Sequence, residues 1–301
     1  MNLITLIEVC SARLTEAGVS FGQGTTNAFD EAAWLVLWRL GMPLDALDQV
    51  EELAVDGPHL AAVHALIDQR ITSRQPAAYL TGEAWLQGVP FTVDARCIIP
   101  RSLIAEPLAE GSIDAWLSDR TRSVLDLCTG NGSLAVLAAM AWPEVAVDAA
   151  DLSADALAVA RINIDRHRLA DRIALHQGDG LAAVAGRAYD LVLCNPPYVN
   201  QASMAALPAE FKTEPALALA GGTDGMDFIR GLLQQAAQHL TPDGVLVLEI
   251  GHERPHFEAA FPTLDVVWLP TSAGDDQVLL LTRAALTTLP QTLHQTVRPT
   301  P

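Results

Sequence analysis

Lysine is almost absent from the sequence: Lys212 is the only lysine among 301 residues, and the other 17 basic residues are arginines. The chain carries 36 acidic residues, so its formal net charge is −18. Both halves are acidic, with 14 acidic and 6 basic residues in 1–110 and 22 and 12 in 111–301. No run of arginines forms a basic segment, and bare nucleic acid repels a chain of this charge. We therefore expect no direct sequence-specific nucleic-acid binding, whereas a basic protein partner or a cationic ligand is favoured.

Cysteines are few and scattered. Cys10, Cys97, Cys128 and Cys194 form no C-x-x-C pair, which argues against a disulfide framework and against a zinc site, so no metal is expected. No apolar run approaches the roughly 18–20 residues that span a bilayer. Residues 1–18 have the pattern of an amphipathic helix and lack a basic leader, unlike a signal peptide. We expect no membrane association and a cytoplasmic location.

The hydrophobic pattern changes three times along the chain. Residues 1–80 show apolar positions at helical spacing, which predicts a small helical domain. Residues 81–110 alternate and turn at Gly88 and Asp94, as a β-hairpin or linker would. Residues 111–286 alternate between strand and helix and end in two strands joined by a turn at 272–275. The proline-containing segment 287–301 is expected to be a flexible tail.

The alternating segment predicts the fold class. Seven strands are expected, at 124–128, 145–150, 173–176, 191–194, 245–250, 264–269 and 277–282. Alternating strands and helices indicate an α/β fold with a doubly wound, mostly parallel, Rossmann-like sheet and right-handed crossovers. The last two strands add an antiparallel hairpin at the edge.

A glycine-rich loop follows the first of these strands. Gly130-Asn131-Gly132 opens the next helix, where glycines let a ligand approach the backbone. Asp151 ends the second strand, about 20 residues on, where an acid can accept hydrogen bonds from ribose hydroxyls. By itself this pattern also fits a dinucleotide enzyme, or a turn that binds nothing.

Two further acids separate these alternatives. Asp126, at the end of the first strand, suits the amino group and sulfonium of S-adenosylmethionine, whereas it would repel a pyrophosphate. Asp179, after the third strand, could accept from an adenine amino group. Singly, Asp126 could be a helix N-cap carboxylate and Asp179 a turn former. Three acids at the carboxyl ends of successive strands share the ligand-binding edge of such a sheet, so S-adenosylmethionine is the expected cofactor.

The tetrapeptide Asn195-Pro196-Pro197-Tyr198 follows the fourth strand. It could be a rigid turn, because two prolines fix the backbone. Its place at the ligand edge favours chemistry on a planar NH₂ group, whose delocalised lone pair is a poor nucleophile. The Asn195 side-chain oxygen and the Pro196 carbonyl can each accept one hydrogen and aim the lone pair at a sulfonium methyl group. Tyr198 would supply an aromatic wall. Asn195, Pro196 and Tyr198 are the predicted catalytic residues.

These motifs carry a resemblance. Residues 126–132 (DLCTGNG) with 195–198 (NPPY) resemble amino-group methyltransferases that use S-adenosylmethionine. Residues 76–83 (PAAYLTGE), 99–102 (IPRS), 214–225 and 249–251 (EIG) resemble the protein-(glutamine-N(5)) methyltransferases, over about residues 20–285. The resemblance implies the S-adenosylmethionine-dependent methyltransferase fold, methylation of a glutamine amide nitrogen, and a substrate-recognising N-terminal domain. It also implies cofactor contacts from Asp126, Thr129, Gly130, Gly132, Asp151, Asp179 and Asn195.

Two branches of this family differ in substrate, which is either a peptide release factor or protein three of the large ribosomal subunit. Residues 21–27 (FGQGTTN), Arg101-Ser102 and 207–211 (LPAEF) resemble the ribosomal branch. The expected substrate is therefore a basic ribosomal protein, with a release factor as the alternative. Two residues depart from the branch: Leu103 stands where proline is usual, and Pro107 interrupts a predicted helix.

The remaining site residues concern the substrate. Pro197, Arg101 and Glu214 are expected to bind it. Arg101 could anchor the substrate backbone or the cofactor carboxylate, or form an ordinary surface ion pair. Glu214 with Pro215 is expected to shape the acceptor pocket near Tyr198, unless it only forms a loop turn. Glu249 is interpreted as structural, and His252 and His256 as surface residues without an acid–base partner. A nucleic-acid amino-methyltransferase and a nicotinamide oxidoreductase are the less favoured alternatives.

Overall fold

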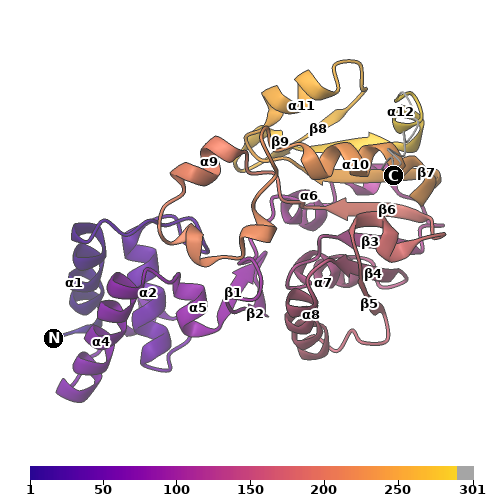
Figure 1. The fold of residues 1–301 in the computed structure, drawn as a ribbon. Coiled ribbons are helices and arrows are strands. Elements are labelled where there is room, and N and C mark those ends of the chain that lie inside the picture. Colours follow the sequence, from indigo (N-terminus) through magenta and orange to yellow (C-terminus); the bar gives the residue numbers. More distant parts are fainter. Residues whose placement is uncertain (290–301) are drawn as a thin grey trace, which may run out of the picture.

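The N-terminal part of the chain is helical, as its apolar spacing predicts (Figure 1). The computed structural model describes residues 1–289. The side chain of Asn27 caps the second helix by accepting a hydrogen bond from the Asp30 N–H at 2.9 Å, a common role of asparagine. The helices pack around one core in which Leu6, Leu35 and Ile67 are fully buried. They are α1 Leu3–Glu16, α2 Ala28–Arg39, α3 Leu47–Val50, α4 Gly57–Ser73 and α5 Ala77–Thr81.

A short antiparallel hairpin follows the N-terminal helices. Strand β1 (Glu83–Leu86) pairs antiparallel with β2 (Val89–Thr92). Between them Gln87 and Gly88 both have positive φ, 49° and 74°, which is the geometry of a two-residue type I′ turn.

Pro107 does not interrupt a helix, contrary to the expectation. It is the third residue of the short helix α6 (Ala105–Ala109). The N–H groups of a first helical turn have no partner within the helix, so a proline there loses no hydrogen bond.

A seven-stranded sheet forms the rest of the molecule, and the predicted fold class is confirmed. Its order is β5-β4-β3-β6-β7-β9-β8, with the first five of these strands parallel and β9 antiparallel to both its neighbours. The strands are β3 Ser123–Leu127, β4 Ala146–Asp151, β5 Ile173–Gln177, β6 Tyr189–Cys194, β7 Leu240–Glu249, β8 Val267–Thr271 and β9 Gly274–Thr282.

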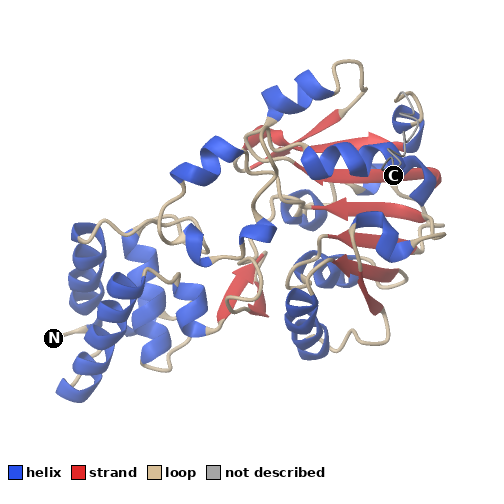
Figure 2. Ribbon diagram, in the orientation of Figure 1, coloured by secondary structure: helices blue, strands red, loops and turns tan. Residues whose placement is uncertain are grey.

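Helices cover both faces of the sheet (Figure 2). Side chains alternate along a strand, so Val124 of β3 packs into the core beneath α7 while Leu125 packs into the core beneath α10. Helices α6, α7 and α8 contribute to the first core, and α10, α11 and α12 to the second. Apart from three helical segments in the loop after β6, the remaining ones are α7 Ser133–Ala141, α8 Ala154–Arg166, α10 Asp227–Ala236, α11 Arg254–Ala260, α12 Arg283–Leu286, and the 3-10 turns η1 Asp114–Trp116, η2 Gly180–Val184 and η5 Ala237–His239.

A long loop leaves the sheet directly after the NPPY sequence. Residues 199–220, here called the acceptor loop, include α9 (Gln201–Ala206), η3 (Phe211–Thr213) and η4 (Ala216–Ala218). The loop is closed at its base, where the Val199 N–H donates to the Leu219 carbonyl at 2.8 Å. Figure 1 shows it crossing from the sheet to the N-terminal helices.

The end of the chain is only partly described. Of the predicted flexible tail 287–301, residues 290–301 lie outside the described residues. Leu289, the last one described, is partly buried and packs against the core beneath α10. Within residues 1–289 no helix is both long enough and apolar enough to cross a membrane.

Candidate active site

A cavity of about 610 Å³ lies at the carboxyl ends of β3, β4, β5 and β6. This is the edge at which doubly wound sheets bind ligands, and the volume is in the range of small-molecule sites. Each of the four strands contributes a loop to the wall, so residues predicted from separate motifs meet here. They are Asp126, Thr129, Gly130, Asp151, Asp179, Asn195, Pro196, Pro197, Tyr198 and Arg101.

Two predicted site residues, Gly132 and Glu214, do not line the cavity. Gly132 caps α7 with φ 81°. A Cβ on it would lie 3.2 Å from the Cβ of Ala160. Because Gly132 has no side chain, α7 and α8 can approach each other. Gly132 itself does not line the cavity. Glu214 lies behind the wall and acts on it through Arg101.

The glycine loop is held from the neighbouring strand. The Gly130 N–H donates to Asp151 Oδ2 at 2.9 Å, and the Ser153 N–H donates to Oδ1 of the same carboxylate at 2.8 Å. Burial raises the pKa of Asp151, although these hydrogen bonds oppose the rise. Asp151 thus fixes the loop and also presents its carboxylate to the cavity.

Asp126 has the contacts of a helix-capping carboxylate and also lines the cavity. Its Oδ2 accepts from the Thr129 hydroxyl and, at 2.9 Å, from the Ala135 N–H in the first turn of α7. Its other oxygen accepts no hydrogen bond from the described residues. Burial raises the pKa of Asp126 to about 7 because these two donors only partly offset desolvation. A cation in the cavity would favour the ionised form.

The third acid lies at a more open part of the cavity. Asp179 is exposed, and its carboxylate accepts no hydrogen bond within residues 1–289. Ile98, Leu152 and Phe228 line the same cavity. No motif pointed to these apolar residues, although Leu152 directly follows Asp151 and is 49% exposed.

The acceptor groups expected in the NPPY sequence are free. Asn195 directly follows β6, whose Cys194 pairs with Leu127 of β3. Neither the Asn195 side chain nor the Pro196 carbonyl has a hydrogen-bond partner among the described residues. Two hydrogen-bond acceptors are therefore available side by side on the cavity wall.

Tyr198 is fixed by the buried side chain of Glu249, which the sequence indicated as structural without indicating its partners. Its hydroxyl donates to Glu249 Oε1 at 3.0 Å. Glu249 Oε2 accepts from the Ser102 hydroxyl at 2.6 Å and from the Leu103 N–H at 2.9 Å. Burial raises the pKa values of both Glu249 and Tyr198. A proline at position 103 would lack this N–H donor, so the departure at Leu103 adds one hydrogen bond to the network.

Residues 113–222 match the methyltransferase small domain family. A ribosomal protein uL3 glutamine methyltransferase from Bordetella pertussis is 55% identical over 289 residues, which is 95% of this chain and 97% of the relative. The enzyme of the same name from Burkholderia pseudomallei is 50% identical and covers 92% of each chain. The chain belongs to the ribosomal protein uL3 glutamine methyltransferase family.

The solved structures agree on the fold. The catalytic domain of human Mettl16, solved with an RNA hairpin, superposes with a TM-score of 0.50 at 14% identity. The match covers 75% of this chain and 81% of that domain. At this identity the similarity indicates a common methyltransferase fold.

Glycines pack tightly around Tyr198 in this methyltransferase, and they belong to the motifs at 214–225 and 249–251. A Cβ on Gly221 would lie 2.7 Å from Tyr198 Cα, and one on Gly225 would lie 2.3 Å from the Tyr198 carbonyl oxygen. Gly251, at φ 52°, faces the ring, where a Cβ would lie 2.5 Å from Cε2. The motifs that follow the NPPY sequence thus enclose its tyrosine.

Arg101 of this methyltransferase is not in a surface ion pair. Its two terminal nitrogens contact the two carboxylate oxygens of Glu214 at 2.7 and 2.8 Å, and the Glu214 side chain is fully buried. Glu214 also accepts from the Ile99 N–H at 3.0 Å. The guanidinium carbon lies 5.5 Å from the ring centroid of Phe211. Arg101 and Glu214 therefore join the 97–101 wall of the cavity to the acceptor loop.

The expectation that His256 has no acidic partner was wrong. Glu253 Oε2 contacts His256 Nδ1, while Glu253 Oε1 accepts from the Asn200 side chain at 2.7 Å. Asn200 is near the base of the acceptor loop, so Glu253 helps to hold that loop. His256 contacts the other oxygen of the Glu253 carboxylate, on its more exposed side.

Proposed function

We propose that this protein transfers a methyl group from S-adenosylmethionine to the side-chain amide nitrogen of a glutamine in ribosomal protein uL3. One observation carries the proposal: relatives named for this activity are up to 55% identical across nearly the whole chain. The free acceptors at Asn195 and Pro196 support it, because an amide NH₂ needs two of them. A release factor, the alternative substrate, is less favoured because these relatives are named for uL3.

The cavity fits S-adenosylmethionine. The acids Asp126, Asp151 and Asp179 line it, and the charge of Arg101 is already matched by Glu214. This balance favours a cation and disfavours a pyrophosphate. We assign Thr129, Gly130 and Asp151 to the ribose side, Asp179 to the adenine, and Asp126 with Asn195 to the cationic end. When bound, the cofactor supplies a methyl group on a positively charged sulfur.

The acceptor amide would be held by the chain itself. The Asn195 oxygen and the Pro196 carbonyl each accept one amide hydrogen, which turns the nitrogen lone pair toward the methyl group. The Tyr198 ring, held by Glu249, forms one wall of the pocket. No general base is required, because the nitrogen becomes acidic on methylation and then releases its proton to water. Positioning therefore provides most of the catalysis.

The parts of the chain have distinct roles in this proposal. Residues 1–80 receive the protein substrate, and residues 81–110 link them to the catalytic part of the chain. Residues 111–286 bind the cofactor and catalyse the methyl transfer. Ribosomal proteins are basic because they bind RNA, so the net charge of −18 favours their association with this enzyme. Their synthesis and assembly place the reaction in the cytoplasm.

The test is to offer the enzyme purified uL3 and a release factor separately, with isotopically labelled S-adenosylmethionine, and to locate the label by mass spectrometry. We expect one labelled glutamine in uL3 and none in the release factor. Label on the release factor alone, or on another residue type, would contradict the proposal.

A further inference from the structure

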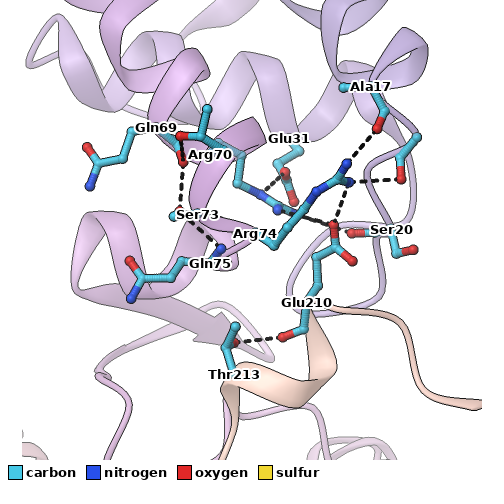
Figure 3. A network of polar contacts seen from close by, with 12 residues as sticks. Ala17, Ser20, Glu31, Gln69, Arg70, Ser73, Arg74, Gln75, Glu210 and Thr213 are labelled. Atoms are coloured by element: carbon cyan, nitrogen blue, oxygen red, sulfur yellow. Dashed lines mark hydrogen bonds and ion pairs between the residues drawn. The ribbon is translucent and has the colours of Figure 1, made fainter.

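Besides the contact of Asn200 with Glu253, three contacts attach the acceptor loop to the rest of the molecule. Its base is closed by the backbone hydrogen bond between Val199 and Leu219. Its second half is joined to the cavity wall by the pair of Glu214 and Arg101. Its apex meets the N-terminal helices through Glu210, which is only 2% exposed (Figure 3).

Glu210 lies between two arginines of the N-terminal region. Its Oε1 is 3.2 Å from Nη1 of Arg74 and 3.6 Å from Nη1 of Arg70. Burial opposes ionisation of Glu210, but hydrogen bonds from its own N–H, the Ser20 N–H and Arg74, with the charge of Arg70, outweigh it. The pKa of Glu210 therefore lies below its ordinary value. Glu210 is thus an ionised carboxylate in a nearly dry junction.

The arginines in turn hold the 17–27 segment. Arg70 donates to Glu31 at 2.8 Å and to the Ser20 carbonyl at 3.1 Å. Arg74 donates to the Ala17 carbonyl at 2.8 Å. Two carboxylates and two guanidiniums balance, so the cluster is neutral. We call Glu31, Arg70, Arg74 and Glu210 the junction cluster.

Both segments joined by the junction cluster line the active-site cavity. Gly22 and Thr26 line it from the N-terminal side. Phe211, next to Glu210, lines it from the acceptor loop and faces Gly22, where a Cβ would lie 3.3 Å from its Cζ. The other loop residues on the wall are Val199, Leu207, Pro215, Leu217, Ala218 and Leu219. None of these residues belongs to the glycine loop or to the acids assigned to the cofactor.

We propose that Glu210 is a positioning residue for the protein substrate: by pairing with Arg70 and Arg74 it holds the acceptor loop against the N-terminal helices and so preforms the acceptor side of the cavity. This inference rests on the proposed function and adds to it. The N-terminal region then completes the pocket for the glutamine as well as receiving the substrate.

The order of the acceptor loop in the empty enzyme should affect the KM for the protein substrate. Without the pair, the apex with Phe211 is free in the empty enzyme, and the substrate must order it on binding. That lowers the affinity for the substrate and leaves the saturated complex unchanged, so KM rises while kcat is retained. The cofactor side of the cavity is built from other loops, so cofactor affinity is retained too.

The experiment uses the full-length enzyme with uL3 and compares the wild type with Glu210→Gln, Glu210→Asp and Arg74→Gln. Glu258→Gln is the matched control, because Glu258 pairs with Arg254 on the exposed surface of α11. We expect Glu210→Gln to raise the KM for uL3 about tenfold, with kcat and the Kd of S-adenosylmethionine within about threefold of wild type. Arg74→Gln should raise KM in the same direction, Glu210→Asp should restore most of the loss, and Glu258→Gln should match wild type.

The outcomes separate the two hypotheses. Unchanged KM in both Glu210→Gln and Arg74→Gln would overturn the positioning role, as would a loss confined to kcat and the melting temperature. If Glu210→Gln does not fold, Arg74→Gln decides, because Arg74 is 32% exposed and tolerates substitution better. Failure of the proposed function would instead appear in the wild type, as cofactor binding without methylation of uL3.

Discussion

The hydroxyl of Tyr198 donates a hydrogen bond to the buried carboxylate of Glu249 across 3.0 Å. Glu249 ends β7, whereas Tyr198 follows β6 and directly precedes the acceptor loop. The same carboxylate accepts from Ser102 and Leu103 at the edge of the cavity. One side chain thus connects the NPPY sequence to the segment before α6, and it fixes the orientation of the aromatic ring.

Two substitutions of Tyr198 should distinguish the contribution of its aromatic ring to activity from that of its hydroxyl. Tyr198→Phe keeps the wall but leaves a Glu249 oxygen without a donor, so we expect kcat/KM for uL3 to fall about tenfold or less. Tyr198→Ala removes the wall and should lower it by about a hundredfold or more. Steady-state kinetics of both variants test this order, and equal losses would mean that the ring itself contributes nothing.

Asn195→Ala should abolish methylation and spare cofactor binding. The substitution removes one of the two acceptors that hold the amide, so we expect kcat to fall by about a thousandfold or more. Because Asp126, Asp151 and Asp179 keep their cofactor contacts, the Kd of S-adenosylmethionine, measured by calorimetry, should rise by no more than about threefold. Loss of cofactor binding instead would assign Asn195 to the cofactor alone.

Asp126 should make cofactor affinity depend on pH. Its pKa of about 7 in the free protein means that the carboxyl is largely protonated at lower pH. Binding of a cation favours the ionised form, so affinity should rise about tenfold between about pH 6 and pH 8 and then level off. Asp126→Asn keeps the acceptor for Thr129 and Ala135 and should bind with a flat pH profile. Equal slopes in both proteins, measured by calorimetry, would remove Asp126 from this role.

The same group has the opposite effect on the stability of the ligand-free protein. Its folded-state pKa is raised above the unfolded value, so its contribution to the free energy of unfolding falls as pH rises from about 4 to about 7 and is constant above that. Denaturant titrations of the wild type and Asp126→Asn should differ in slope only within this window.

Gly251→Ala should damage catalysis through Tyr198. The new Cβ would meet the ring at 2.5 Å, and the positive φ of 52° disfavours any L side chain. We expect kcat/KM to fall about tenfold or more, with cofactor affinity unchanged. Gly231→Ala in α10 is the control: nothing lies within 4 Å of its Cβ position, so it should stabilise the protein by about 0.5–1 kcal/mol. Wild-type kinetics in Gly251→Ala would show that the ring tolerates displacement.

The fold and the cavity edge were predictable because they depend on local patterns. Strand and helix periods, with Gly130 and Asp151 at strand ends, predict the sheet and the edge where ligands bind. Asn195 and Tyr198 could be placed at this edge because their tetrapeptide follows a predicted strand, and both line the cavity.

The supporting contacts were not predictable in the same way. Glu249 meets Ser102 across 147 positions, and Glu210 meets Arg70 across 140. Such pairs depend on tertiary packing and have no signature of residue type or spacing. Gly132 shows the converse: a glycine in a ligand motif packs on Ala160 instead. Sequence patterns thus locate the chemistry, whereas the residues that hold it in place emerge from the packing.

Salt should weaken association with the protein substrate. The chain has a net charge of −18 spread over both of its parts, and ribosomal proteins are basic, so long-range attraction speeds their encounter. Raising the ionic strength from about 0.05 M to about 0.5 M shortens the screening length to a few ångströms and should raise the KM for uL3 several-fold. The Kd of the small cofactor, which binds in a cavity with matched charges at short range, should change much less. A KM that is indifferent to salt would show that the acidic surface plays no part in substrate docking, and that recognition depends on short-range contacts around the cavity.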